Sequence, residues 1–181
     1  MHGTENPSAW VQRWAHLIAP GSTVLDVACG AGRHMRHLSA LGHRVTGVDR
    51  NPEAVAMAQA SGRVICADIE NGPWPFAGQT FGCVVVTHYL WRALLPTLVS
   101  TVAPGGVLIY ETFAAGNESV GKPSRPDFLL QPGELLKATV GLRTVAYEDG
   151  FESSPDRFVQ RIVAVRDGPS AAIERWPLQA A

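Results

Sequence analysis

The chain has 181 residues, of which 46% are apolar and 17% charged, and its formal net charge is −1. This length and composition predict one globular α/β domain over residues 1–181. The balanced charge argues against nucleic-acid binding, because that function normally requires a strongly basic surface. No apolar run approaches the ~18 residues that a membrane-spanning helix needs. We therefore expect a domain that binds neither nucleic acid nor membrane.

Cysteine usage and the first residues of the chain bear on the cellular compartment. The three cysteines show no CxxC spacing, which favours reduced thiols over a disulfide framework. Residues 1–7 lack the basic region and the apolar region of a secretory signal. Both observations predict a cytoplasmic protein.

The first predicted element is an amphipathic helix at about residues 8–19. Trp10, Trp14 and Leu17 recur at helical spacing, and Pro20 ends the pattern. Two compatible interpretations stay open for this helix. Its tryptophans would pack against a sheet, and the helix would also serve as a lid over a ligand pocket.

A buried strand at residues 23–28 is predicted to run into a tight turn and then a helix at residues 33–41. Apolar and β-branched residues favour the strand, although Asp26 interrupts them. Gly30 and Gly32 permit positive φ angles and let a ligand approach bare backbone. The helix begins with unpaired N–H groups, which favour an anionic or polar ligand. The turn is therefore predicted to bind a cofactor.

The remaining strands are predicted at residues 44–48, 63–67, 81–86, 107–111, 142–147 and 158–165. Helices predicted between most of them indicate a parallel sheet that is covered on both faces. The last two strands follow each other without a helix, which predicts an antiparallel pair at one edge. The expected fold is a Rossmann-like three-layer αβα sandwich with a mostly parallel seven-stranded sheet and an antiparallel edge strand.

Three other segments carry specific expectations. Four basic residues on one face of the helix after the glycine turn predict a solvated surface rather than a metal site: Arg33, His34, Arg36 and His37. The segment from residue 112 to 131 is long for a loop in a compact domain, which predicts a functional or mobile segment. The tail from about residue 167 is expected to be loosely attached.

Polar residues follow the carboxyl ends of several predicted strands. Asp49 ends the second strand and Asp68 follows the third. Thr87 and His88 follow the fourth strand, and Glu111 ends the fifth. Ligands of open α/β sheets bind at the carboxyl ends of the strands. We therefore expect these residues to converge on one crevice.

The type of nucleotide can be narrowed down from the same residues. A dinucleotide fingerprint requires a third glycine, but Gly32 is followed by Arg-His-Met at residues 33–35. Asp26 would repel a pyrophosphate and attract a cationic or amino-bearing group. Asp49, about 20 residues beyond the turn, is suited to accept hydrogen bonds from ribose hydroxyls. A phosphate-free nucleoside with a positive charge fits better than NAD.

Several motifs resemble the class I S-adenosylmethionine-dependent methyltransferases: Asp26-x-Ala28-x-Gly30-x-Gly32, Asp49, Asp68, Trp74-Pro75-Phe76 and Ala103-Pro104-Gly105-Gly106. The resemblance covers residues 23–165. Within the family, the stretch at residues 127–136 is most similar to small bacterial tellurite-resistance-like methyltransferases. One departure is Ala28, where many members have glycine.

The resemblance implies S-adenosylmethionine as methyl donor, with S-adenosylhomocysteine as product. Contacts with this cofactor are implied for Asp26, Ala28, Gly30, Gly32, Asp49, Asp68, Ile69 and Thr87. Asp26 would hold the methionine ammonium side, Asp49 the ribose hydroxyls and Asp68 the adenine amino group. The implied activity is in-line methyl transfer to a small-molecule acceptor by a monomer or homodimer, with no metal.

The sequence indicates the residues that contact the acceptor less clearly than those that contact the cofactor. His88 and Glu111 are candidates for a general base, although His88 is also suited to the cofactor wall and Glu111 to a buried anchor. Tyr89 and Arg125 are candidates for acceptor contacts. Two other functions stay open: an NAD-dependent Rossmann oxidoreductase, and a non-catalytic regulatory module that binds S-adenosylmethionine.

Overall fold

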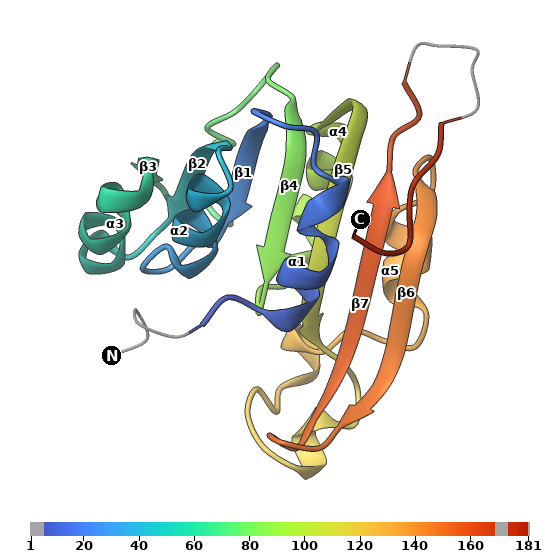
Figure 1. The fold of residues 1–181 in the computed structure, drawn as a ribbon. Helices are drawn as coiled ribbons and strands as arrows, with labels where there is room; N and C mark the ends of the chain where they lie inside the picture. The colour runs from blue at the N-terminus through green and yellow to red at the C-terminus, as the bar shows by residue number, and fades with distance from the viewer. Residues whose placement is uncertain (1–5, 169–173, 181) are drawn as a thin grey trace.

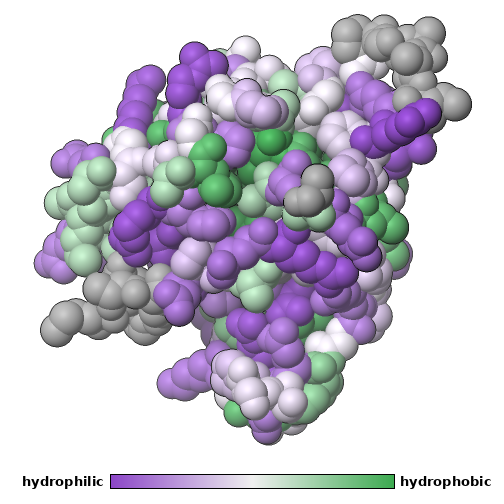
Figure 2. All heavy atoms as spheres, in the orientation of Figure 1, coloured by the Kyte–Doolittle hydropathy of each residue, from purple (hydrophilic) through white to green (hydrophobic). Residues whose placement is uncertain are grey.

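The computed structural model describes residues 6–168 and 174–180 (Figure 1). Residues 1–5, on which the expectation of no secretory signal partly rests, lie outside the described residues, as do residues 169–173 of the tail. Polar and apolar side chains are mixed over the face of the molecule in Figure 2. No helix within the described ranges has the length and apolar character that crossing a membrane requires.

Seven strands and five α-helices make up the described chain. The strands are β1 (Thr23–Val27), β2 (Arg44–Asp49), β3 (Arg63–Cys66), β4 (Phe81–Thr87), β5 (Val102–Phe113), β6 (Arg143–Glu152) and β7 (Arg157–Val165). The helices are α1 (Ala9–Trp14), α2 (Arg33–Ala40), α3 (Pro52–Ala58), α4 (Leu95–Ser100) and α5 (Glu134–Ala138). Short 3₁₀ turns lie at Ala15–Leu17, Gln59–Ser61, Arg92–Leu94, Asn117–Ser119 and Pro126–Phe128.

The seven strands form one sheet in the order β3-β2-β1-β4-β5-β7-β6. Strands β1 to β5 pair in parallel, and β7 is antiparallel to both β5 and β6. This confirms the prediction of a mostly parallel sheet with an antiparallel pair at one edge. Strand β6 is the edge strand, and β7 lies between β5 and β6. Because β1 and β4 are neighbours, the chain order reverses between them, and a ligand crevice is expected at their carboxyl ends.

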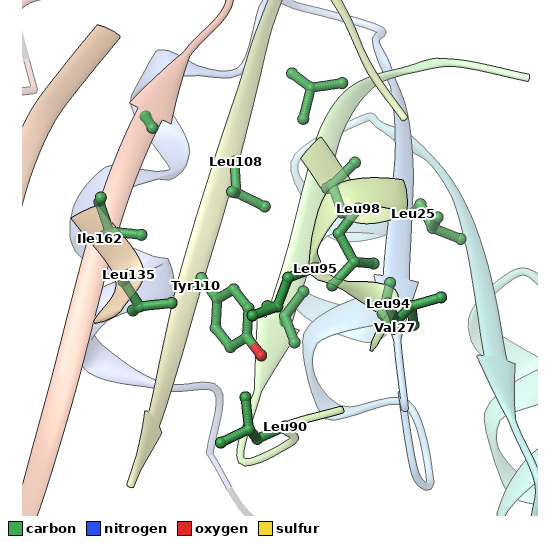
Figure 3. Close-up of a cluster of buried hydrophobic side chains, with 14 of the residues drawn as sticks. Leu25, Val27, Leu90, Leu94, Leu95, Leu98, Leu108, Tyr110, Leu135 and Ile162 are labelled. Atoms are coloured by element: carbon green, nitrogen blue, oxygen red, sulfur yellow. The ribbon is translucent and has the colours of Figure 1, made fainter. Parts of the chain in front are cut away.

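Alternation along the strands divides the core between two faces of the sheet. Val24 and Val85 pack in one cluster with side chains of α1, α2 and α3. Leu25 and Val84 pack in the other, with Leu and Ala side chains of α4 and α5. Figure 3 shows the second cluster, in which leucines of α4 and α5 lie over β1, β5 and β7. The structure is thus a three-layer sandwich, as the sequence predicts.

Two strands extend beyond their predicted bounds. The Ala-Pro-Gly-Gly stretch at residues 103–106 lies inside β5 rather than ending a helix before it. A register shift between Phe81 and Cys83 on the neighbouring β4 accommodates it. The β6–β7 hairpin reaches to Glu152 and Arg157, whose side chains are joined by a hydrogen-bonded ion pair of 2.6 Å.

His34 corrects the prediction that α2 presents a solvated basic face. Its side chain is only 1% exposed. The reason is the N-cap of α1, which lies against the first turn of α2. The backbone N–H of Ser8 donates to His34 Nε2 over 3.1 Å. The imidazole is therefore enclosed by the protein, whereas on an uncovered helix face it would be exposed to water.

Part of the tail is in contact with the N-terminal helix region. His16 Nε2 lies 2.9 Å from the carbonyl oxygen of Pro177, and Trp176 packs against the buried cluster that contains Trp10 and Trp14. These contacts attach residues 174–180 to the body of the domain. The expectation of a loosely attached tail did not anticipate them.

The glycine turn reverses the chain between β1 and α2 in left-handed backbone. Ala28, Gly30 and Gly32 have φ angles of 53°, 53° and 80°. A Cβ atom at Gly32 would lie 2.9 Å from the Cβ of Ala58 in α3, whereas at Gly30 it would meet nothing within 4 Å. Packing against α3 therefore requires glycine at position 32, while the backbone angle alone favours it at position 30.

This difference can be tested with two matched variants. Gly32→Ala combines a strained φ angle with a steric conflict at Ala58, so we expect it to destabilise the protein by about 2–4 kcal/mol. Gly30→Ala carries only the strained angle and should cost about 1 kcal/mol. Urea denaturation of the ligand-free proteins measures both, and equal losses would contradict the packing argument.

Candidate active site

A cavity of about 330 Å³ lies at the carboxyl ends of the parallel strands. The ends of β1, β2 and β3 contribute Ala28, Asp49, Arg50, Ala67, Asp68, Ile69 and Glu70. The ends of β4 and β5, with the segment that follows β5, contribute His88, Tyr89, Leu90, Thr112, Phe113, Pro123 and Phe128. The sequence-based expectation of one crevice formed by distant strand ends agrees with this arrangement.

Asp49 joins the end of β2 to the glycine turn. Its Oδ2 accepts a 2.8 Å hydrogen bond from the backbone N–H of Gly30, and its Oδ1 accepts a 2.9 Å bond from the N–H of Asn51. These bonds orient the carboxylate on the cavity wall. Each oxygen keeps a second lone pair, so the group can still accept hydrogen bonds from a diol.

Asp68 is held in the same way at the end of β3. Its carboxylate accepts hydrogen bonds from the side chain of Asn71 at 3.0 Å and from the backbone N–H groups of Glu70 and Asn71. The Asn71 bond is the main cause of a lowered pKa of Asp68, and the two backbone bonds add to it. Asp68 is therefore an ionised hydrogen-bond acceptor at neutral pH.

Asp26 lies near the carboxyl end of β1, is only 1% exposed and does not line the cavity. Its Oδ2 is buried without a hydrogen-bond partner. The pKa of Asp26 is raised to about 7, mainly because burial disfavours the charged form; Arg33 lowers this pKa, Asp49 raises it, and the hydrogen bond from the Met35 N–H lowers it. A buried carboxylate oxygen that lacks a partner fits an ammonium group, bound directly or through water.

A second group of polar residues links α1, α2 and β4. His34 Nε2 accepts from the Ser8 N–H, so its Nδ1 carries the proton and donates to Thr87 Oγ1 over 3.4 Å. Burial is the main cause that lowers the pKa of His34 to about 3, and the charge of Arg33 adds to it. The imidazole is therefore neutral. Thr87 is buried and does not line the cavity.

Glu111 is equally buried, with 1% exposure, and does not line the cavity. It accepts hydrogen bonds from Ser8 Oγ at 2.9 Å and from Arg161 Nε at 2.5 Å. Arg161 also pairs with Glu148 and Glu152. These bonds match the anchor role that the sequence left open for Glu111 better than direct contact with an acceptor.

His88 lies on the cavity wall with about a third of its side chain exposed (34%). Its φ angle of 53° is unusual for a residue other than glycine, and such backbone occurs preferentially at functional sites. Arg33 Nη2 lies 3.3 Å from its Nδ1, and Arg157 Nη1 lies 3.4 Å from its Nε2. The ring packs on Phe113 at 5.0 Å between centroids.

The two predicted acceptor contacts differ in position. Tyr89 lines the cavity, and its buried hydroxyl interacts with the carboxylate of Glu70. Arg125 does not line the cavity: its guanidinium pairs with Asp127 at 2.7 Å and stacks over Phe128 at 5.2 Å. Both Arg125 and Asp127 are largely exposed, so this pair belongs to the outer surface.

The segment from residue 112 to 131 closes one side of the cavity and is held by several bonds. Arg92 donates to the carbonyl oxygens of Asp127 and Leu129, each at 2.8 Å, and pairs with Glu134. Asn117, which is buried, donates to the carbonyl of Pro123. These contacts position Pro123 and Phe128 on the cavity wall.

Eight residues of the cavity wall were not among the predicted site residues: Arg50, Ala67, Glu70, Leu90, Thr112, Phe113, Pro123 and Phe128. The first four directly adjoin predicted site residues at strand ends, so extending each strand end by one residue would have found them. Pro123 and Phe128 belong to the long segment, whose path depends on tertiary contacts that no local pattern encodes.

Comparison with known proteins finds one matching family and several similar proteins. Residues 24–106 match the family described as a methyltransferase domain. A relative is the malonyl-[acyl-carrier protein] O-methyltransferase of Serratia marcescens, which is 36% identical over 107 residues. The match covers 54% of this chain and 41% of that protein, so the chain spans less than half of its length.

Solved structures show the same fold. TehB from Haemophilus influenzae superposes with a TM-score of 0.66 at 21% identity, covering 84% of this chain and 60% of that one. A TehB-like S-adenosylmethionine-dependent methyltransferase from Corynebacterium glutamicum gives 0.67 at 18% identity, covering 91% and 90%. This likeness shows that the chain shares the fold of these two proteins.

Residues 6–168 and 174–180 hold no group of three or more His, Cys, Asp or Glu side chains suited to a metal. The chemistry that the site offers is hydrogen-bond acceptance by the carboxylates of Asp49 and Asp68 and an aromatic wall beside His88.

The raised pKa of Asp26 predicts a pH effect on stability. Between the unfolded value of 3.8 and the folded value of about 7, the folded protein binds more protons than the unfolded chain, so this group makes stability fall as pH rises. Asp26→Asn removes the buried charge. In the ligand-free protein, we expect its advantage in melting temperature over the wild type to grow from pH 5 to pH 8.

Thermal unfolding of both proteins at several pH values between 5 and 8 measures this effect. Asp127→Asn, which alters an exposed surface carboxylate, is the control, and its melting temperature should differ from that of the wild type by the same amount at every pH. If the difference in melting temperature between the wild type and Asp26→Asn did not change with pH, burial would not be holding Asp26 protonated.

Proposed function

We propose that this chain is an S-adenosylmethionine-dependent methyltransferase that acts on a small-molecule acceptor, and the match of residues 24–106 to a methyltransferase domain supports this proposal. The observation that carries the proposal is a pair of carboxylates, Asp49 and Asp68, on the wall of one cavity, together with a third carboxylate, Asp26, buried near the end of β1. One of them, Asp26, has a buried oxygen without a partner. A cationic nucleoside without phosphates complements these groups.

The residues assigned to the cofactor follow from this complementarity. Asp26 holds the ammonium of the methionine part, and Asp49 accepts from both ribose hydroxyls. Asp68 accepts from the adenine amino group, beside the apolar side chain of Ile69, which lines the same wall. The left-handed turn lets Ala28, Gly30 and Gly32 present backbone rather than side chains.

When bound, S-adenosylmethionine supplies the methyl group and a neutral thioether as leaving group. The chain has mainly to align the acceptor in line with that group and to exclude water, which is a large effect where positioning is good (~7–11 kcal/mol). The aromatic and apolar wall formed by Leu90, Phe113, Pro123 and Phe128 supports an acceptor with an apolar body.

We assign acceptor contact to His88. It is the ionisable side chain that lines the cavity at the end of β4, and a base is needed when the acceptor arrives protonated. Glu111 Oε1 lies 4.0 Å from His88 Nε2, close enough to stabilise a positive charge on the ring. Glu111 then acts through His88, as a positioning residue.

The proposal also covers the cellular compartment, the class of acceptor and the oligomeric state. The free thiols of Cys29, Cys66 and Cys83 support a cytoplasmic protein. The net charge of −1 supports a small acceptor over a nucleic acid. We propose a monomer or homodimer.

The experiment that tests the function is transfer of a labelled methyl group from S-adenosylmethionine into a panel of thiols, amines, phenols and chalcogen oxyanions. We expect label in at least one class, with S-adenosylhomocysteine formed in equal amount. Cofactor binding without transfer to any class would instead favour a regulatory module.

Once an acceptor has been identified, His88→Asn tests whether His88 acts as the general base. We expect turnover to fall by about 100-fold or more, because general-base catalysis contributes ~10²–10⁴-fold, while the affinity for S-adenosylhomocysteine changes little. His16→Asn is the matched control, since His16 lies outside the cavity and bonds backbone carbonyls of Arg13 and Pro177. If His88→Asn kept the turnover of the wild type, His88 would not be the base and would only form part of the cavity wall.

A further inference from the structure

Ser8 directly precedes the first helix, and its hydroxyl contacts three groups at once. The oxygen accepts hydrogen bonds from the backbone N–H groups of Trp10 and Val11, over 3.1 Å and 3.4 Å, and so caps α1. A serine hydroxyl has two lone pairs and one proton. Because the two N–H groups occupy the lone pairs, the proton points to the third neighbour, Glu111 Oε1, at 2.9 Å. Ser8 is therefore a hydrogen-bond donor to a carboxylate as well as a helix cap.

The carboxylate that Ser8 holds lies next to His88. Glu111 is 1% exposed, and its two oxygens have separate partners. Oε2 accepts from Arg161 Nε, whereas Oε1, which accepts from Ser8, lies 4.0 Å from His88 Nε2. The backbone N–H of His88 also donates to the carbonyl oxygen of Glu111 over 2.9 Å. The Ser8 hydroxyl thus fixes the carboxylate oxygen that faces the His88 ring.

The balance of charge around the His88 ring depends on the position of that oxygen. Arg33 Nη2 lies 3.3 Å from Nδ1 and Arg157 Nη1 lies 3.4 Å from Nε2, so two positive charges face the ring. Glu111 brings a negative charge against them. Its Oε1 is buried, and a buried carboxylate oxygen that loses one donor has to find another. Removal of the Ser8 proton is therefore expected to change the distance between Oε1 and His88 Nε2.

Ser8 is linked to the same residue by a second route, through its backbone. Its N–H donates to His34 Nε2 over 3.1 Å, and His34 Nδ1 lies 3.4 Å from Thr87 Oγ1. Thr87 directly precedes His88, whose φ angle of 53° persists only if the surrounding structure fixes it. The ring and the backbone of His88 are thus both joined to Ser8.

We propose that Ser8 is a positioning residue for His88, which it keeps in place through the carboxylate of Glu111. The cap of α1 then has a part in methyl transfer, although no residue of this helix lines the cavity. The inference rests on the proposed function, because it takes His88 to be the residue that contacts the acceptor.

Two substitutions separate the Ser8 hydroxyl from the helix cap. Ser8→Gly removes the hydroxyl, and glycine at the N-cap keeps most of the stability of the helix, whereas Ser8→Thr keeps both hydroxyl and cap. With an identified acceptor and saturating substrates, we expect Ser8→Gly to lower turnover about 10-fold, the factor that corresponds to one hydrogen bond to a charged group. Its affinity for S-adenosylhomocysteine should equal that of the wild type. Ser8→Thr should restore the turnover of the wild type.

Ser100→Gly is the matched control. Ser100 is exposed at the end of α4, and its Oγ donates to the carbonyl oxygen of Thr97 over 2.9 Å. Strand β5 begins just after it, at Val102, so Ser100 lies near the amino ends of the strands and away from the cavity. Glycine in a helix costs stability, so this variant shows whether a loss of stability alone lowers turnover. We expect the turnover of the wild type.

NMR spectra of the histidine ring nitrogens in the ligand-free proteins are the second measurement, and they require no acceptor. The signals of His88 are those that are missing from His88→Asn. We expect Ser8→Gly to shift them, Ser8→Thr to return them to their positions in the wild type, and Ser100→Gly to leave them unchanged. A helix cap without a link to His88 would not move these signals.

Three results would overturn the inference: ring signals of His88 that are the same in Ser8→Gly and the wild type, equal turnover of these two proteins, or a loss of turnover that is matched by a loss of affinity for S-adenosylhomocysteine. The last result would mean that Ser8 supports the cofactor site rather than His88. If the wild type transfers no methyl group to any acceptor, the proposed function fails, whereas the NMR comparison still decides whether Ser8 positions His88.

Discussion

The hydrogen bond from the backbone N–H of Gly30 to the carboxylate of Asp49 joins the two strand ends on which the site is built. It holds the glycine turn against β2, together with the bond from the Cys29 N–H to the Val48 carbonyl at 3.0 Å. The left-handed angles at Ala28, Gly30 and Gly32 are what allow the turn to reach Asp49. These two bonds close the glycine turn onto the end of β2, and this contact fixes where α2 begins and helps to bury Asp26.

A second constraint lies on the other side of the site, where buried charge is balanced by hydrogen bonds. Glu111 is bonded by both Ser8 and Arg161, and a buried ion pair is tolerated when such additional bonds satisfy its atoms. Ser8 is also the N-cap of α1 and a partner of His34. The first helix is therefore coupled to the end of β5 and to α2, next to His88. Trp10 and Trp14 pack in the buried core as predicted, whereas no residue of α1 lines the cavity, so a lid function for this helix stays a prediction.

The sequence predicted the fold and the carboxylates because both depend on regular patterns. Alternating elements indicate a parallel sheet, and the carboxyl ends of parallel strands meet at one edge, so Asp49 and Asp68 could be placed without coordinates. His34 could not, because helical spacing assigned it to the outer face and only the packing of α1 encloses it. The environment of Tyr89 likewise depends on Glu70 and Arg50, which come from other strands. Tertiary contacts between distant segments decided both cases.

The central claim is that the cavity binds a cationic nucleoside without phosphates. Calorimetric titration of the wild-type chain with S-adenosylmethionine, S-adenosylhomocysteine and NADH under one set of conditions tests it most directly. The carboxylates around the glycine turn predict that both S-adenosyl compounds bind at one site per chain and that NADH does not bind. Tight binding of NADH, with no response to either S-adenosyl compound, would contradict the claim.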